Sequence, residues 1–347
     1  MKKTIVSIAV ALMLLTGLVP SMALAATQTG STTGSVTVAN KAPVIGTPTL
    51  TALTPNTSAT LTIPVTEYNT LNDIAEVWVV LAFDASDAEG GLDSKGVGDT
   101  VVSTLAIFKW TPALGFVCVG PDSTPNNNWE SVTGTPPTLT GTTDNFVFTI
   151  PVSKVARYAA GGNGADGWDV YIKVTDKKPV TPNTDEDGPK GTQGSVPKTL
   201  VDKAMASYAS LAVAPGTIDF GTLDPGVSQQ PITTPVSGYY TATSIVNKIY
   251  ELQIKSTDWT DGGSNTAVLD EDGTPGANSF SLEADDDGGA PGAQFVTKTE
   301  ATVAGHATDA RSTTEAGNGV DVSLWLTLGS TVVAAAYSGG VTMTVVY

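Results

Sequence analysis

The sequence predicts an all-β protein that consists of two β-sandwiches in tandem. Residues 77–83 form a continuous apolar run of strand-forming residues, which is typical of a strand buried on both faces at the centre of a sandwich. Shorter strand-like segments recur along the chain, separated by clusters of Thr, Ser, Gly, Pro and Asn. About 320 residues follow the N-terminal leader, and this length indicates two domains.

Residues 1–25 have the order of parts of a cleavable secretory signal. Lys2 and Lys3 precede an apolar run at 5–19, and the small-residue pattern A-L-A follows at 23–25. A membrane anchor is the alternative, but the run spans about 15 residues where a spanning helix needs about 20. We therefore predict cleavage of the signal peptide, a secreted or cell-surface (extracytoplasmic) location and no transmembrane anchor.

The chain is acidic but sparsely charged. It contains 34 acidic and 17 basic residues, for a net charge of -17, yet charged residues make up only 15% of it. A surface of this sign repels nucleic acid and anionic lipid, so we exclude nucleic acid as a partner. Hydrophobic residues make up 41% of the chain, which is enough for packed cores and argues against an acidic disordered tail.

Residues that carry enzyme chemistry are scarce. Cys118 is the one cysteine and His306 the one histidine, far apart in the sequence, so we expect neither a Cys–His pair nor a Ser–His–Asp triad, and we interpret Cys118 as a buried strand residue. The G-x-S-x-G, H-E-x-x-H and G-x-x-x-x-G-K-[ST] motifs are absent from the sequence. Most acidic residues lie in Gly/Pro loops, where no rigid element would hold the carboxylate pair of a glycosidase. We therefore predict that the protein is not an enzyme.

Residues 26–39 form a Thr/Ser/Gly-rich segment that we expect to be flexible and to contain a short strand at 35–38. This strand has two interpretations. It is the first strand of the adjoining domain, or it pairs with the open sheet edge of a neighbouring molecule. The partners that we consider are therefore a second copy of the chain, through its edge strands, and other envelope components.

Residues 40–177 are predicted to form the first sandwich. Strands are expected at 49–53, 59–66, 77–83, 101–110, 114–119, 145–152 and 168–175, and an acidic, glycine-rich loop at 84–99. Asn69, Asn72 and Asp73 favour turns and predict a corner before the central strand. Trp129 lies in an Asn-rich loop, where we expect it to be exposed or half-buried.

Six segments of this region form a series. They read N-T-L-N-D-I-A-E-V-W-V-V-L at 69–81, F-K-W-T-P at 108–112, G-F-V-C-V-G-P-D at 115–122, N-N-W-E at 127–130, V-S-K-V-A-R at 152–157 and W-D-V-Y-I-K-V-T-D at 168–176. The series resembles Ig-like modules of uncharacterised exported archaeal and bacterial surface proteins, and it covers most of residues 40–177. The resemblance implies an Ig-like sandwich and carries over no catalytic residue.

Residues 178–199 are rich in Pro, Gly and charge without periodicity, so we place an acidic linker there and a second sandwich at 200–347. Strands of the second sandwich are expected at 207–213, 239–246, 250–256, 320–328 and 341–347. Ile218, Phe220 and Leu223 are buriable, and Pro225-Gly226 favours a turn. This stretch, I-D-F-G-T-L-D-P-G at 218–226, resembles the I-D-F-G-x-L-x-P-G opening of Ig-like modules common in secreted and cell-surface proteins.

Acidic loop insertions lie between these strands, within residues 261–291. Clustered carboxylates beside glycines are candidate Ca²⁺ ligands. The candidates are Asp270, Asp272, Asp285, Asp286 and Asp287. The spacing does not match the helix–loop–helix calcium pattern, because with Gly273 in the sixth position a ligand would fall at Val268. A Ca²⁺ site and a plain solvated loop are therefore both open interpretations, and we expect no other cofactor.

Together these features predict a non-catalytic, secreted cell-surface protein with a structural or adhesive function. An envelope or filament subunit is favoured by the N-terminal strand and the Thr/Val-rich sheets. The alternative is a secreted carbohydrate- or surface-binding module, in which Trp129 or Trp259 would stack on a sugar.

Overall fold

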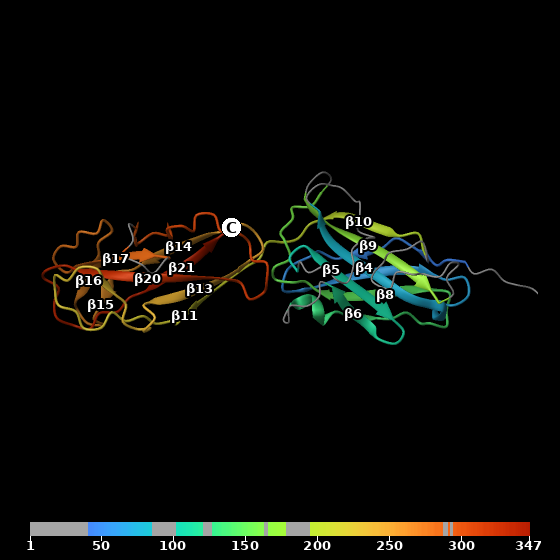
Figure 1. Cartoon of the computed structure of the whole chain (residues 1–347), viewed down its shortest axis with the longest axis horizontal. Helices are drawn as coiled ribbons and strands as arrows, with labels where there is room; N and C mark the ends of the chain where they lie inside the picture. Colours follow the sequence, from blue (N-terminus) through green and yellow to red (C-terminus); the bar gives the residue numbers. More distant parts are fainter. Residues whose placement is uncertain are drawn as a thin grey trace, which may run out of the picture. The chain divides into compact units, whose positions relative to one another are not determined.

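Strands dominate the chain in the computed structural model (Figure 1). The structure describes residues 41–84, 102–120, 127–162, 166–177, 195–286, 291 and 294–347, and no α-helix occurs among them. The predicted signal peptide, the segment at 26–39, nearly all of the acidic loop at 84–99 and most of the linker at 178–199 lie outside the described residues. Asn40–Tyr347 constitutes one compact unit. Nothing in the described ranges is a helix of the length and apolarity needed to cross a membrane.

Two antiparallel sheets make up the N-terminal half. The first has the order β1 (Val44–Ile45), β3 (Ser58–Thr66), β8 (Thr143–Pro151) and β7 (Thr133–Thr135), and β2 (Thr49–Leu50) also pairs with β3. The second has the order β10 (Lys198–Lys203), β9 (Gly167–Asp176), β4 (Ile74–Asp84), β5 (Leu105–Thr111) and β6 (Gly115–Gly120). The predicted central strand is confirmed, because β4 lies between β9 and β5 (Figure 1). A 3-10 turn, η1 (Leu71–Asp73), forms the predicted corner between β3 and β4.

The two N-terminal sheets share one hydrophobic core. Strands β3 and β8 alternate buried and half-buried residues, so each presents one apolar face. Aromatic pairs pack between the two sheets. The ring centroids of Trp110 and Phe146 are 4.7 Å apart, as are those of Phe116 and Phe148. Both pairs have the edge-to-face geometry that aromatic rings favour. The arrangement is therefore sandwich-like.

Trp129 belongs to this core, and the expectation that it would be exposed or half-buried was wrong. It lies on the 3-10 turn η3 (Asn128–Ser131) with no exposed surface. Its ring packs against Phe108 and Trp168, and its indole Nε1–H donates to the Val102 carbonyl at 3.1 Å. The polar neighbours of Trp129 favour a surface loop, but η3 turns the indole inward, where its one polar group finds a partner.

Strand β10 extends the N-terminal half past the predicted boundary at 199/200. It pairs with β9 along the edge of the second sheet. Met205, just beyond β10, is fully buried in the same core. Its backbone forms isolated β-bridges with Leu53 and with Ala159. Strand β10 begins and ends with a lysine, so its sequence resembles a linker. Lysines are also typical of an edge strand, which is what β10 is.

The C-terminal half also contains two sheets. The larger has the order β11 (Ala209–Ala214), β13 (Tyr239–Val246), β20 (Asn318–Leu328), β17 (Ser279–Asp285), β16 (Thr266–Leu269) and β15 (Trp259–Thr260), with β12 (Gln230–Pro231) on β20 and β18 (Gln294–Phe295) on β17. The smaller has the order β19 (Ala301–Thr302), β14 (Glu251–Ser256) and β21 (Val341–Val346). Their shared core includes Phe280 and Leu324 from the larger sheet and Ile254 from the smaller. As predicted, Ile218, Phe220 and Leu223 pack on this core.

We expect the Trp129→Ala substitution to lower the free energy of unfolding by about 3–5 kcal/mol, because it leaves a cavity among aromatic rings and removes the donor to Val102. Trp259→Ala is the control and should cost less, because Trp259 is only half-buried. Urea unfolding followed by circular dichroism measures both. A loss below about 1 kcal/mol for Trp129→Ala would contradict the packing described here.

Candidate functional site

The junction between the N-terminal and C-terminal halves is built on Asn247, which follows β13 and is fully buried. Its side-chain amide donates to the carbonyls of Ala156 (2.7 Å) and Ala206 (2.9 Å), and its Oδ1 accepts from the Tyr208 N–H (2.8 Å). Its backbone N–H donates to the Tyr208 carbonyl, and its own carbonyl accepts from the Tyr158 N–H. A buried amide is stable only when its polar groups are paired in this way. We call Asn247 and these partners the junction clamp.

A second polar attachment at the junction is made by Glu315, from the loop before β20. Its Oε1 accepts hydrogen bonds from the Ser153 hydroxyl (2.6 Å), the Lys154 N–H (3.0 Å) and the Asn128 N–H (3.1 Å). All three donors belong to the N-terminal half. Hydrogen bonds to a carboxylate are stronger than those between neutral groups, so one side chain ties two loops of the N-terminal half to the C-terminal half.

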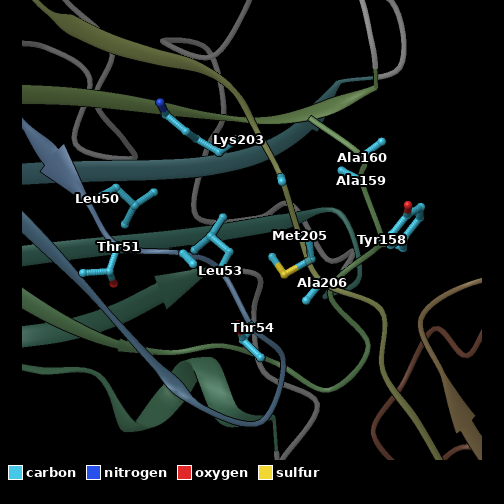
Figure 2. A pocket seen from close by; sticks show the side chains of 12 residues that line it. Leu50, Thr51, Leu53, Thr54, Tyr158, Ala159, Ala160, Lys203, Met205 and Ala206 are labelled. Atoms are coloured by element: carbon cyan, nitrogen blue, oxygen red, sulfur yellow. The ribbon is translucent and has the colours of Figure 1, made fainter. Parts of the chain in front are cut away.

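A cavity of about 370 Å³ lies beside the junction clamp, lined by residues 50–54, 158–160 and 203–206. Figure 2 shows Met205 between Leu53 and Ala159, with Lys203 and Tyr158 farther out. Most of the lining is alanine and aliphatic or small polar side chains. Lys203 and Tyr158 are its ionisable groups, and the lining holds no carboxylate, imidazole or thiol.

The predicted ligands Asp270 and Asp272 fold their own loop. Asp270 Oδ1 accepts from the N–H groups of Asp272 (3.2 Å) and Thr274 (3.1 Å). Asp272 Oδ1 accepts from the Thr274 hydroxyl (2.6 Å) and N–H (3.2 Å), and these bonds lower the pKa of Asp272. Gly273 has a φ of +80°, and the Phe295 ring lies where a Cβ would stand. The loop thus has a local structural explanation.

The other predicted ligands lie on a different segment. Asp285 ends β17, and the carboxylate of Asp286 is 2.8 Å from His306 Nε2. His306 Nδ1 is 2.9 Å from Asp309 Oδ1, so this ring lies between two carboxylates, an arrangement that the sequence spacing does not indicate. Asp287 lies outside the described residues. Within the described ranges, no group of three or more His, Cys, Asp and Glu side chains is arranged to hold a metal ion.

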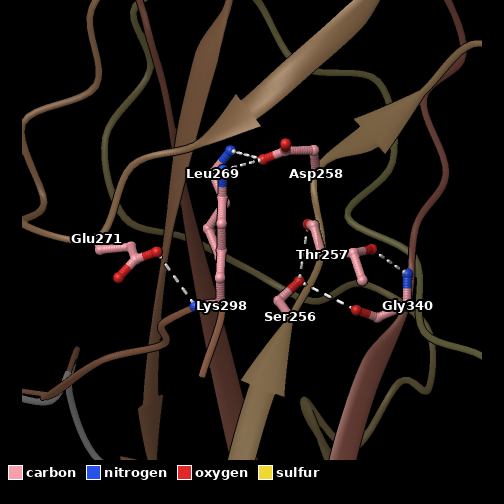
Figure 3. A network of polar contacts seen from close by, with 7 residues as sticks. All are labelled: Ser256, Thr257, Asp258, Leu269, Glu271, Lys298 and Gly340. Atoms are coloured by element: carbon pink, nitrogen blue, oxygen red, sulfur yellow. Dashed lines mark hydrogen bonds and ion pairs between the residues drawn. The ribbon is translucent and has the colours of Figure 1, made fainter. Parts of the chain in front are cut away.

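A further acidic side chain, Asp258, takes part in a structural network (Figure 3). Its Oδ1 is 2.8 Å from Lys298 Nζ and also accepts from the Leu269 N–H at 2.8 Å. The Lys298 N–H donates to Glu271 Oε1 at 3.3 Å. The network therefore links three segments of the C-terminal half and uses part of the acidic surface for intramolecular contacts.

Cys118 and Trp259 are both engaged in packing. Burial raises the pKa of Cys118 to about 11, and its thiol donates to the Gly120 carbonyl at 3.3 Å. Such a thiol is a poor nucleophile at neutral pH. The Trp259 ring packs on Phe280 with centroids 4.5 Å apart, and Gly339 lies so close to its edge that a Cβ there would be 1.9 Å from Cδ1. Trp129 is buried and offers no face for sugar stacking, whereas Trp259 is half-buried.

Substitution of Asn247 by Ala tests the junction clamp. It leaves the carbonyls of Ala156 and Ala206 and the N–H of Tyr208 without their partner, at roughly 1–3 kcal/mol for each buried group left unpaired. We expect faster hydrogen exchange at the Tyr208 amide and proteolysis near residues 206–208 under native conditions. Gln253→Ala on β14 is the control and should change neither. Unchanged exchange at Tyr208 in Asn247→Ala would contradict the role of the clamp.

No protein-family model and no curated protein match the sequence of this chain.

Proposed function

We propose that the chain is a non-catalytic structural or adhesive protein of the cell surface, exported by a cleaved signal peptide and built from two tandem Ig-like sandwiches. We further propose that it assembles with other copies through a strand edge. The arrangement of the described residues supports a structural role, because acidic side chains such as Asp258, Asp270 and Asp272 serve loop and network contacts. The observation that carries the proposal is the outer edge of β21.

Most sheet edges in the described residues carry devices that block further strand pairing. Strands β1, β2, β7, β15 and β19 are two or three residues long. Strand β10 carries lysines and a register shift, and β6 pairs through another register shift. Short length, charge and irregular register are the usual protections against edge-to-edge association. Strand β21, V-T-M-T-V-V, has none of them over six residues.

The backbone of β21 leaves a row of free hydrogen-bonding groups. Leu252 and Ser256 of β14 donate away from β21, to the carbonyls of His306 and Thr297. The backbone N–H and C=O groups of successive residues in a strand point to opposite sides. The backbone groups of Thr342 and of alternate residues after it therefore face β14, and those of Val341 and of alternate residues after it face outward. No other described strand pairs with this outer edge. Strand β11, also uncharged, lies in contact with β21 but does not pair with it.

An added strand fits this edge. Its main chain would bond to the outward groups of β21, and its alternate side chains would extend the apolar face of the smaller sheet, as in strand-addition complexes. The expected strand at 35–38 of another copy, S-V-T-V, has the required alternation. We propose it as the donor.

A lysine on the edge strand tests this proposal. Thr342 is exposed on β21, so Thr342→Lys adds a charge without removing a buried side chain. We expect this variant to fold and to lose the multimers that light scattering should detect for the wild type. Thr266→Lys is the matched control, an exposed threonine on β16, which is paired on both sides, and it should assemble normally. Equal assembly of wild type and Thr342→Lys would count against β21 as the acceptor.

A further inference from the structure

The turn before β3 contains the only match in the chain to the acceptor pattern for N-glycosylation, N-x-[ST]. The match is Asn56-Thr57-Ser58. In secreted proteins, asparagines in this pattern carry sugars on surface loops. Because the pattern fixes only two positions it also arises by chance, so the geometry of the turn has to distinguish a glycan acceptor from a plain turn.

The turn exposes all three residues of the pattern. The Thr57 N–H donates to the Thr54 carbonyl at 3.2 Å, and Asn56 has a φ of +61°, as the third residue of a type II turn does. The Asn56 N–H donates to the Val152 carbonyl at 2.9 Å, and the Val152 N–H donates to the Thr57 carbonyl at 2.8 Å. These bonds anchor the backbone, while the side chains of Asn56, Thr57 and Ser58 are exposed.

The side-chain amide of Asn56 directs its oxygen toward the protein and leaves its nitrogen free. Asn128, on η3, donates from its own Nδ2 to the Val152 carbonyl at 3.2 Å and to Asn56 Oδ1 at 3.4 Å. An amide nitrogen only donates, so the atom of Asn56 that meets it is the oxygen. Among the residues that the structure describes, none accepts a hydrogen bond from Asn56 Nδ2. The atom to which a sugar is attached is therefore unengaged and at the surface.

Ser58 supplies the hydroxyl of the pattern at the first position of β3. Its hydroxyl has no partner within the described ranges, whereas the Thr57 hydroxyl donates to the Thr54 carbonyl at 2.7 Å. The turn explains an asparagine at position 56, because asparagine tolerates a positive φ. It sets no requirement for a hydroxyl at position 58. Ser58 is therefore the residue that separates a glycan acceptor from a plain turn.

We propose that Asn56 is an N-glycosylation site, to which an oligosaccharyltransferase moves an oligosaccharide from a lipid-linked phosphate donor. Asn56 Nδ2 forms a bond to the anomeric carbon of the first sugar and loses one proton. The bond from that carbon to the donor phosphate breaks, and its electron pair leaves on the phosphate oxygen. The proposal rests on export, which is part of the proposed function. The glycan would add a bulky, solubilising group to the N-terminal half beside Asn128.

Mass spectrometry of the full mature protein, isolated from the cells that encode it, tests the proposal. We expect the intact mass to exceed that of residues 26–347 by the mass of a glycan, and fragmentation of the peptide to place the sugar on Asn56. Ser58→Ala should lose all of the added mass although Asn56 is kept, and Ser58→Thr should retain it, because threonine carries the same hydroxyl. Ser131→Ala, which removes an exposed hydroxyl from η3, is the control and should retain it as well.

The N-terminus found in the same sample separates this proposal from export. A chain that begins at residue 26 with Asn56 unmodified overturns the glycosylation site and leaves export standing. A chain that retains residues 1–25 with Asn56 unmodified overturns both. Added mass that persists in Ser58→Ala, or a sugar that fragmentation places on a serine or threonine hydroxyl instead of Asn56, also overturns the proposal.

Discussion

Complete hydrogen bonding of the buried Asn247 side chain is the constraint on which the junction depends. Asn247 itself follows β13, and its partners come from the loop between β8 and β9 and from the segment between β10 and β11, so the clamp forms only when sheets of both halves are in place. Each half buries its own hydrophobic core, and the polar junction adds specificity to their connection rather than apolar area. Glu315 adds a charged contact of the same kind.

The exposed edges of the sheets connect this architecture to the proposed function. A β-protein that remains monomeric must block its edges, and β10 does so with lysines and a register shift. Strand β21 lacks such protection although it is the longest edge strand of its sheet. In an assembling protein an unprotected edge is the binding surface. The junction clamp would then transmit mechanical force between β21 in the C-terminal half and the donor segment that precedes the N-terminal half in the sequence.

Sequence patterns predict where the strands of this fold lie better than they predict which distant residues pack against them. The apolar run of β4 and the alternation of β14 are local properties, and so is the I-D-F-G opening, whose Phe220 packs where its apolarity indicates. Trp129 and β10 were misjudged because their burial depends on distant partners, Phe108 and Trp168 for the former and β9 for the latter. The candidate metal ligands show the same limit, since composition cannot reveal that Asp270 and Asp272 accept bonds from their own loop.

We propose that the protein assembles through a donated N-terminal strand. Size-exclusion chromatography with light scattering, combined with negative-stain electron microscopy, tests this proposal most directly on the mature chain from residue 26 and on a truncated chain from residue 42. We expect filaments or sheets for the longer chain and folded monomers for the truncated one. Monomers from both chains, at concentrations where the longer one is folded, would contradict it.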